Sequence, residues 1–295
     1  MIWSLGIGFG SDVFNTRITG PIQTGSDIGG QSLYVADPFI FIHEASATWY
    51  IFSEVLNNAC QKGEIGLHLS RDKGATWYFD RIVLTENWHL SFPFVVEHDG
   101  GFHMLTCATS GTHAPYSLHL YTASEFPHQW QLSAGIIFDL EGYPIDPVIL
   151  QHEGHWYVFL LDDGINMERL FVSENLFGPY EEHPYSMKYL IRHSGRIINV
   201  DPVGLWAFHH TGTTVERWQI KKLTPSEYEY GDRIPLLGPM EASWASAGMH
   251  TFSALKLDDG WVVVVDGWWN DFTHTTFHYL EGGSGSCQNK SSCQE

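Results

Sequence analysis

The sequence predicts an all-β fold, a five-bladed β-propeller, and three observations support this prediction. A short apolar run recurs along the chain, a second apolar run follows each copy after a polar turn, and helical periodicity is absent. Repeats of roughly 40 to 50 residues that hold several short strands are typical of propellers, because each four-stranded blade buries its faces only against its neighbours. Five copies therefore predict five blades.

Prolines align the first three copies of the repeat. Pro38, Pro93 and Pro147 lie 55 and 54 residues apart, and two apolar residues follow each of them. The fourth and fifth copies lack the proline but keep the two apolar runs. The first runs are residues 37–40, 92–95, 146–149, 196–199 and 252–255, and the second runs are residues 49–52, 102–105, 156–159, 205–208 and 261–265.

The chain ahead of the first repeat also contains a strand pattern. Residues 2–9 carry apolar side chains at every odd position from 3 to 9, which is typical of a half-buried strand. The last blade has three evident strands, the third at residues 275–279, so we expect the N-terminal strand to join it as the fourth. This closes the ring and removes exposed sheet edges. Residues 11–34 are rich in Gly, Ser, Thr and Asp and are expected to cross the face of the ring.

Outer strands follow the paired apolar runs in the first four blades. The turn at residues 71–74, Arg-Asp-Lys-Gly, suits a tight hairpin between two of them. The expected outer strands are residues 63–70 and 77–78 in blade one, 116–121 and 130–132 in blade two, 167–172 in blade three, and 214–220 with 223–228 in blade four.

Length and charge limit the domain organisation and the partners. We expect one propeller domain over residues 1–281 and a polar Gly/Ser/Cys tail over residues 282–295, since propellers run long as single units. The formal net charge of −19 argues against nucleic acid, which binds through clustered Lys and Arg. A neutral partner such as a carbohydrate fits better. No run reaches the roughly 18 apolar residues of a membrane span, and the start lacks signal-peptide features.

The cysteines fall into two groups. Cys60 and Cys107 lie in the repeats and are expected to be free, as small buried hydrophobes. Cys287 and Cys293 lie in the tail beside the sequon at Asn289, where a disulfide would indicate an extracellular location and could support an oligomer. The alternative is a flexible linker end, so the sequence leaves the localisation open.

Two aspartates mark the candidate site. The first strand of each blade lines the central channel, and Asp37 and Asp146 hold equivalent positions at the start of that strand in blades one and three. Two facing carboxylates suit glycoside hydrolysis, in which one activates water and the other steadies positive charge on the sugar ring. The alternative is that an Asp before Pro caps a turn at a strand start.

Several motifs resemble one known group of proteins. The chain is similar over residues 1–281 to the five-bladed propeller at the N-terminus of glucosamine inositolphosphorylceramide transferases and their bacterial relatives, although not to the transferase's separate catalytic domain. That propeller resembles the fold of glycoside hydrolase family 43, whose members are inverting glycosidases. The motifs that carry the resemblance are residues 34–39, 54–56, 63–66, 88–95, 247–250 and 265–267.

The resemblance implies a catalytic set of three carboxyl groups. It implies a base, which Asp37 matches, an orienting Asp, which Asp146 matches, and a Glu as general acid. No carboxylate stands at the positions where the acid is expected, residues 194–196 and 104–109. Glu54, at the inner end of a second strand, is the candidate substitute. Loss of a general acid typically costs about 10²- to 10⁴-fold in rate, so the sequence leaves open whether the protein is an enzyme.

Other residues are predicted to contact substrate. Adjacent strand residues face opposite ways, so only one of His209 and His210 can face the channel. His250 could hold a water or a cation, although a lone histidine is more often simply hydrogen-bonded, and no metal ligand set or cofactor is predicted. The side chains of Trp88 and Trp268 could instead pack between blades. The predicted substrate-binding residues are Trp88, His89, His209, His210, His250, Asp266 and Trp268.

Three functions are consistent with these features. The first is a glycoside-hydrolase-like protein of inverting type that acts on or binds a glycan in the central pocket. The second is a carbohydrate-binding or structural propeller that has lost its general acid. The third is a module that positions a partner protein.

Overall fold

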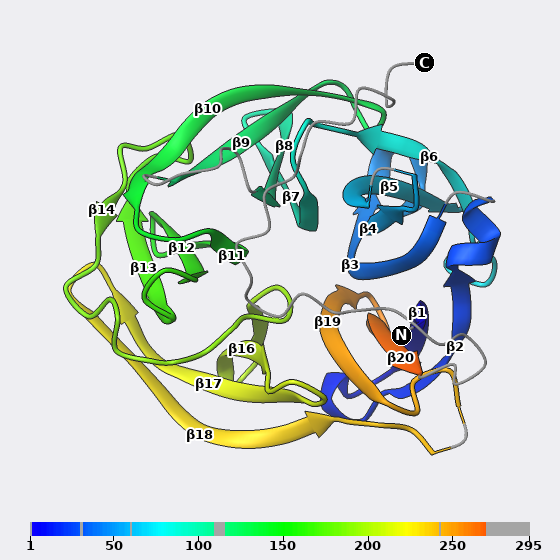
Figure 1. Ribbon diagram of the computed structural model, residues 1–295. Coiled ribbons are helices and arrows are strands. Elements are labelled where there is room, and N and C mark those ends of the chain that lie inside the picture. The colour runs from blue at the N-terminus through cyan, green and yellow to red at the C-terminus, as the bar shows by residue number, and fades with distance from the viewer. Residues whose placement is uncertain (1, 30–31, 60, 109–115, 242, 270–295) are drawn as a thin grey trace.

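The computed structural model describes residues 2–29, 32–59, 61–108, 116–241 and 243–269. Five sheets stand around a central axis, and each holds four antiparallel strands (Figure 1). This confirms the predicted all-β propeller and its five blades. Cys60 and the tail with Cys287, Asn289 and Cys293 lie outside the described residues, so the predictions made for them stay predictions.

The first four blades each take four consecutive strands, counted outward from the axis. Three short 3₁₀ turns lie in connecting segments: η1 (Val13–Asn15), η2 (Gly25–Ile28) and η3 (Glu44–Ser46). The strands are β3 (Ser32–His43), β4 (Thr48–Asn57), β5 (Lys62–Ser70) and β6 (Tyr78–Leu84) in blade one; β7 (Leu90–His98), β8 (Gly101–Ala108), β9 (Tyr116–Glu125) and β10 (Gln129–Leu140) in blade two; β11 (Pro144–His152), β12 (His155–Asp162), β13 (Met167–Ser173) and β14 (Glu181–Glu182) in blade three; and β15 (Ile198–Val200), β16 (Gly204–His210), β17 (Val215–Thr224) and β18 (Glu227–Leu237) in blade four.

Blade five combines both parts of the chain. Its strands run in the order β19 (Gly248–Leu257), β20 (Gly260–Trp269), β1 (Ile2–Gly10) and β2 (Arg17–Thr24). β1 pairs with β20 over its full length, so the N-terminal strand joins the last blade as predicted, but as its third strand rather than its fourth. The expectation that residues 11–34 cross the face of the ring is wrong, because residues 17–24 form the outer strand β2. The strand predicted at 275–279 lies outside the described residues, and β1 and β2 supply the third and fourth strands.

Apolar side chains between neighbouring blades form the core. Phe39 on β3 meets Phe94 on β7 with ring centroids 4.6 Å apart, and Phe208 on β16 meets Phe252 on β19 at 4.5 Å. All four rings are at most 5% exposed. Full burial of a side chain of this size contributes about 1.5–3 kcal/mol, so these contacts hold the ring together blade by blade.

The aligned prolines mark a repeated irregularity of the inner strands. The residues that precede them, Asp37, Phe92 and Asp146, have φ values of 52°, 48° and 47°. Pairing of the inner strand with its neighbour is interrupted at the same place in all three blades. Left-handed conformations are uncommon for residues other than glycine. Because the non-polar Phe92 adopts it too, the conformation belongs to the repeat, and the chemistry depends on the side chain that each blade places there.

Gly195 lies just before blade four and packs against the backbone of blade five. It has a φ of +152°, and a Cβ atom there would lie 1.9 Å from the carbonyl oxygen of Phe252. Its neighbour Ser194 accepts a 2.6 Å hydrogen bond from the Phe252 N–H. We expect Gly195→Ala to lower the free energy of unfolding by about 2–4 kcal/mol, measured by urea denaturation, because backbone rather than a flexible side chain must move. Gly238→Ala, where the nearest atom is a methyl group 3.3 Å away, is the matched control, and equal losses in both variants would contradict this account.

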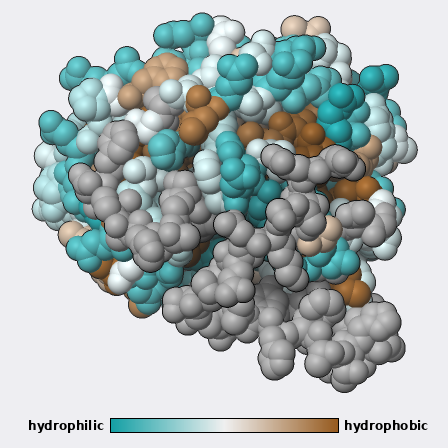
Figure 2. All heavy atoms as spheres, turned by 45° about the horizontal axis from the view of Figure 1, so that its top comes forward, coloured by the Kyte–Doolittle hydropathy of each residue, from teal (hydrophilic) through white to brown (hydrophobic). Residues whose placement is uncertain are grey.

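Hydrophilic residues cover much of the face seen in Figure 2, and hydrophobic residues form small separate areas on it.

Cys107 is free and buried, as predicted. Within the described ranges no helix is both long enough and apolar enough to cross a membrane.

Candidate functional site

An ionic cluster joins blades one and five at the axis. Asp37 and His250 lie 3.1 Å apart, between Oδ1 and Nδ1, and Nδ1 is 3.7 Å from Oδ2 of Asp266. Asp266 on β20 accepts a 2.8 Å bond from the Asp37 N–H and a 2.6 Å bond from the Thr251 N–H. The Thr251 hydroxyl donates to Asp37 at 3.2 Å. Two carboxylates therefore enclose one imidazole.

Opposite charges set the protonation of this cluster. Burial alone would lower the pKa of His250, but hydrogen bonds and charge from Asp266 and Asp37 raise it to about 10. Burial alone would likewise raise the pKa of Asp37, but the hydrogen bond and charge of His250 bring it below its ordinary value. His250 is thus an imidazolium at neutral pH and Asp37 a carboxylate.

The left-handed residue of blade two helps to hold Asp37. The N–H of Phe92 donates to Oδ2 of Asp37 at 3.2 Å. Oδ1 and Oδ2 of Asp37 thereby both have partners from other blades. The repeat that places the aspartate also supplies one of its donors.

Asp146 of blade three pairs with an arginine from the long segment between β14 and β15. Arg192 bonds it through two nitrogens, with Nε at 2.5 Å from Oδ2 and Nη2 at 3.3 Å from Oδ1. Burial raises the pKa of Asp146 while the Arg192 charge opposes that rise. Asp146 is fully buried, whereas the Arg192 side chain is 38% exposed. Arg192 therefore connects the buried aspartate to the surface.

Glu54 on β4 is the third carboxyl group that the sequence predicted. Burial, and then the charge and hydrogen bond of Asp37, raise its pKa well above the ordinary value, so Glu54 is the protonated partner of the ionised Asp37. Its Oε1 atom accepts a 3.0 Å bond from the Tyr34 hydroxyl and lies 3.3 Å from Nε2 of His89. His89 Nδ1 accepts the Gly63 N–H at 3.0 Å, which leaves the ring proton on Nε2, facing Glu54.

His210 completes the centre of the ring. Its ring lies against that of His250 with centroids 4.1 Å apart. Burial and the charge of His250 lower its pKa well below the ordinary value, so it is neutral. Neither of its ring nitrogens has a hydrogen-bond partner among the described residues. A neutral imidazole offers one donor and one acceptor, so His210 has two unused hydrogen-bonding positions, both at buried atoms.

The structure separates three predicted site residues from this cluster. His209 faces away from the axis, toward Tyr230 and Trp218, so His210 is the one of the pair that faces the centre. Trp268 is only 7% exposed and packs on Trp3 at 4.4 Å, in agreement with the packing alternative. Trp88 packs against the main hydrophobic core. The structure brings together Asp37, Asp146, Glu54, His89, His210, His250 and Asp266.

Sequence reasoning missed Arg192, Thr251 and Tyr34. Thr251 and Tyr34 stand beside predicted residues, so their positions next to His250 and in the 34–39 motif were the available signal. Arg192 lies in an irregular segment without periodicity and gave no such signal.

Two sets of side chains at the axis could hold a cation. Asp146, His210 and His250 form one, and Asp37, His250 and Asp266 form the other, with the ligand atoms of each set within 4.8 Å of one another. His250 belongs to both sets. It is already paired with Asp37 and Asp266, and its imidazolium form supplies the positive charge that a cation would bring.

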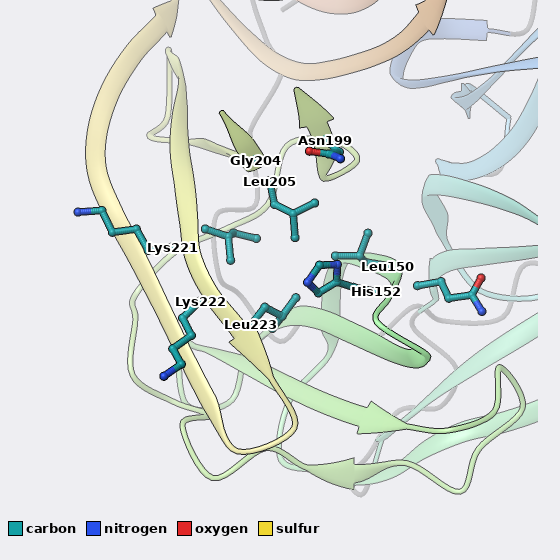
Figure 3. Close-up of a pocket in the computed structure, with 10 residues that line it drawn as sticks. Leu150, His152, Asn199, Gly204, Leu205, Lys221, Lys222 and Leu223 are labelled. Carbon is teal, nitrogen blue, oxygen red and sulfur yellow. The ribbon is translucent and has the colours of Figure 1, made fainter. Parts of the chain in front are cut away.

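A cleft lies at the other end of blades three and four (Figure 3). Its volume is about 400 Å³. Its lining includes residues 150–152, at the end of β11 that is distant from Asp146, and Asn199 on β15. In Figure 3 the Lys221 and Lys222 side chains extend outward from β17, and Lys222 pairs with Glu227 at 2.5 Å. The cleft is therefore separate from the ionic cluster.

Known proteins are similar to this chain in sequence and in fold. The family described as "Glucosamine inositolphosphorylceramide transferase 1, N-terminal" matches residues 12–268. Glucosamine inositolphosphorylceramide transferase 1 of Oryza sativa subsp. japonica is 32% identical over 267 residues, which cover 83% of this chain and 34% of that protein. The Arabidopsis thaliana protein of the same name is 28% identical over 307 residues, covering 90% and 39%. The chain thus spans roughly a third of the length of these relatives.

Solved structures share the fold at low identity. A thermostable family-43 glycoside hydrolase superposes with a TM-score of 0.58 and 14% identity, covering 77% of this chain and 85% of that one. An exo-1,5-alpha-L-arabinanase from a bovine ruminal metagenomic library also gives a TM-score of 0.58, with 17% identity and coverage of 81% and 89%. These likenesses establish the propeller architecture.

Proposed function

Because the chain belongs to the family of N-terminal domains of glucosamine inositolphosphorylceramide transferase 1, we propose that it binds a carbohydrate at the centre of the ring. The relatives are named glucosamine inositolphosphorylceramide transferase 1, a name that includes a sugar and a lipid. The proposed ligand is the neutral sugar portion of a glycan. The observation that carries the proposal is His210, whose two nitrogens have no partner among the described residues at the point where four blades contribute polar groups.

The chemistry of the cluster fits sugar hydroxyls. A hydroxyl both donates and accepts, and so does the neutral His210 ring. Arg192 and His89 are 38% and 37% exposed at their side chains, and Arg192 offers further N–H donors beside the buried carboxylates. The basic groups of His250 and Arg192 lie against the carboxyl groups of Asp37, Asp146 and Asp266, which leaves little net charge to attract an ionic ligand. Preformed polar groups of this kind fix the orientation of a ligand and give specificity.

Hydrolysis is the second candidate, and one observation favours it. Asp37 and Glu54 have pKa values displaced in opposite directions, which is how a base and an acid are commonly distinguished in one site. However, no carboxylate stands at residues 104–109 or 194–196, where the general acid is expected, and Oε1 of Glu54 already accepts a hydrogen bond from the Tyr34 hydroxyl. We therefore place binding ahead of catalysis.

A glycan array combined with a reducing-sugar assay on the same preparation tests the proposal. We expect saturable binding of a neutral oligosaccharide without product, and calorimetry on His210→Ala should show about ten-fold weaker affinity, the value of one lost hydrogen bond. His155→Ala is the control, since this half-buried histidine lies at the β11–β12 turn, at the far end of blade three. Absence of glycan binding, or equal loss in both variants, would refute the proposal.

A further inference from the structure

A second polar cluster lies between blades three and four, away from the axis. It consists of Glu168 on β13, His193, and His209 on β16, which are 1%, 0% and 1% exposed. His193 and His209 face each other across an isolated β-bridge. Tyr230 on β18 reaches the same point from the outer strand of blade four. The proposed carbohydrate site uses none of these residues.

The polar atoms of this cluster form a continuous path. His193 Nε2 lies 2.9 Å from Glu168 Oε1, Glu168 Oε1 lies 3.3 Å from the Tyr230 hydroxyl, and that hydroxyl lies 3.2 Å from His209 Nε2. Ligand atoms of the two histidines and the glutamate all lie within 4.8 Å of one another. Neighbouring ligands of a four-coordinate zinc, with bonds of about 2.0–2.2 Å, lie roughly 3.3–3.5 Å apart. The 2.9 Å between His193 Nε2 and Glu168 Oε1 is somewhat shorter than that spacing, and the ligand atoms of His209 lie within 4.8 Å of both.

The ring nitrogens of the two histidines can supply lone pairs. The Nδ1 atoms of both histidines are buried and have no hydrogen-bond partner among the described residues. With its ring proton on Nδ1, each imidazole presents the lone pair of Nε2 as a ligand.

We propose that Glu168, His193 and His209 bind a divalent transition-metal ion, of which zinc is the representative, and that this ion links blades three and four. Two imidazoles and one carboxylate are a donor set that zinc uses. Imidazole nitrogens favour such ions over calcium or magnesium, which prefer oxygen ligands alone. The Tyr230 hydroxyl borders the proposed site, 3.2 Å from His209 Nε2 and 3.3 Å from Glu168 Oε1.

Zinc titration of the full chain tests the proposal. The purified protein is treated with a chelator, dialysed, and titrated with ZnCl₂ while bound metal and melting temperature are measured. We expect one zinc per chain in this site and a higher melting temperature, because a ligand that binds only the folded state stabilises it. Cobalt(II) in place of zinc should give the visible absorption of a tetrahedral centre without a thiolate charge-transfer band.

Neighbouring residues supply matched controls. His209→Gln and His193→Gln should weaken zinc binding by at least about ten-fold, while His210→Gln, next along β16 but facing the axis, should retain this zinc. The double variant Cys287→Ser with Cys293→Ser should also retain it. Failure of the wild-type protein to bind zinc, or full retention of zinc by a folded His209→Gln, would overturn the proposal. If neither glutamine variant folds, the wild-type cobalt spectrum decides, and a thiolate band or no tetrahedral absorption overturns it.

Discussion

Replacement of His250 by glutamine is expected to lower the free energy of unfolding by about 3–5 kcal/mol at neutral pH. The buried imidazolium lies between Asp37 and Asp266, which are 6% and 0% exposed. Glutamine removes the positive charge and leaves these carboxylates uncompensated, and removal of one partner of a buried ion pair typically has this cost. The measurement is urea denaturation followed by tryptophan fluorescence.

The same residue predicts the pH dependence of the wild-type protein. The pKa of His250 is about 10 in the folded state against an ordinary value of 6.5, so the folded state holds the proton more tightly. Its contribution to stability is complete below about pH 6.5 and decreases as the pH rises toward 10. His210 is neutral throughout this range, since its pKa is lowered. We expect wild-type stability to fall between pH 7 and 10, and His250→Gln to lose most of that slope.

A histidine outside the cluster provides the control for this pair of experiments. His155 lies at the β11–β12 turn. His155→Gln should change the free energy of unfolding by less than about 0.5 kcal/mol and should leave its dependence on pH unchanged. If His250→Gln keeps the wild-type slope, the imidazolium assignment is wrong.

Asp37→Asn is expected to abolish any release of reducing sugar, with a loss of about 10²- to 10⁴-fold if the site hydrolyses glycans. The carboxylate accepts bonds from Thr251 and the Phe92 N–H, and an amide in its place cannot act as a base. Binding measured by calorimetry should change by no more than about ten-fold, because the proposed ligand contacts are Arg192, His89 and His210. Binding and turnover are measured on the same preparation.

An exposed aspartate serves as the comparison for this variant. Asp163→Asn, in the turn after β12, should leave both binding and turnover unchanged. Turnover that persists in Asp37→Asn would exclude Asp37 as the base. Binding without turnover in the wild-type protein would exclude the hydrolytic candidate and leave carbohydrate binding as the function.

The proline-aligned repeat made most of the fold predictable. Pro38, Pro93 and Pro147 revealed the blade period, and the alternation in residues 2–9 revealed the closing strand. The position of β2 was missed because its sequence, Arg17–Thr24, contains a glycine and a proline and has no clear alternation. Its place depends on pairing with β1, a contact between segments that local pattern does not encode.

The site was predictable only where it follows the repeat. Asp37 and Asp146 share one blade position, and ring geometry brings them together. Arg192 comes from an irregular segment, and its pairing with Asp146 arises from tertiary packing. The cluster of Glu168, His193 and His209 was missed for a similar reason, because its members have no metal-ligand spacing in the sequence and meet only across two blades.

The mixed origin of blade five determines the order of events during protein synthesis. β1 ends at Gly10 and its partner β20 begins at Gly260, so the ribosome adds about 250 residues between them, which takes roughly 10–50 s at 5–20 residues per second. Throughout this interval the nascent chain carries an unpaired strand edge. Leu5 and Ile7 pack against Val35 and Ile40 of blade one in the finished protein, so that early blade can shelter β1 until the last hairpin emerges.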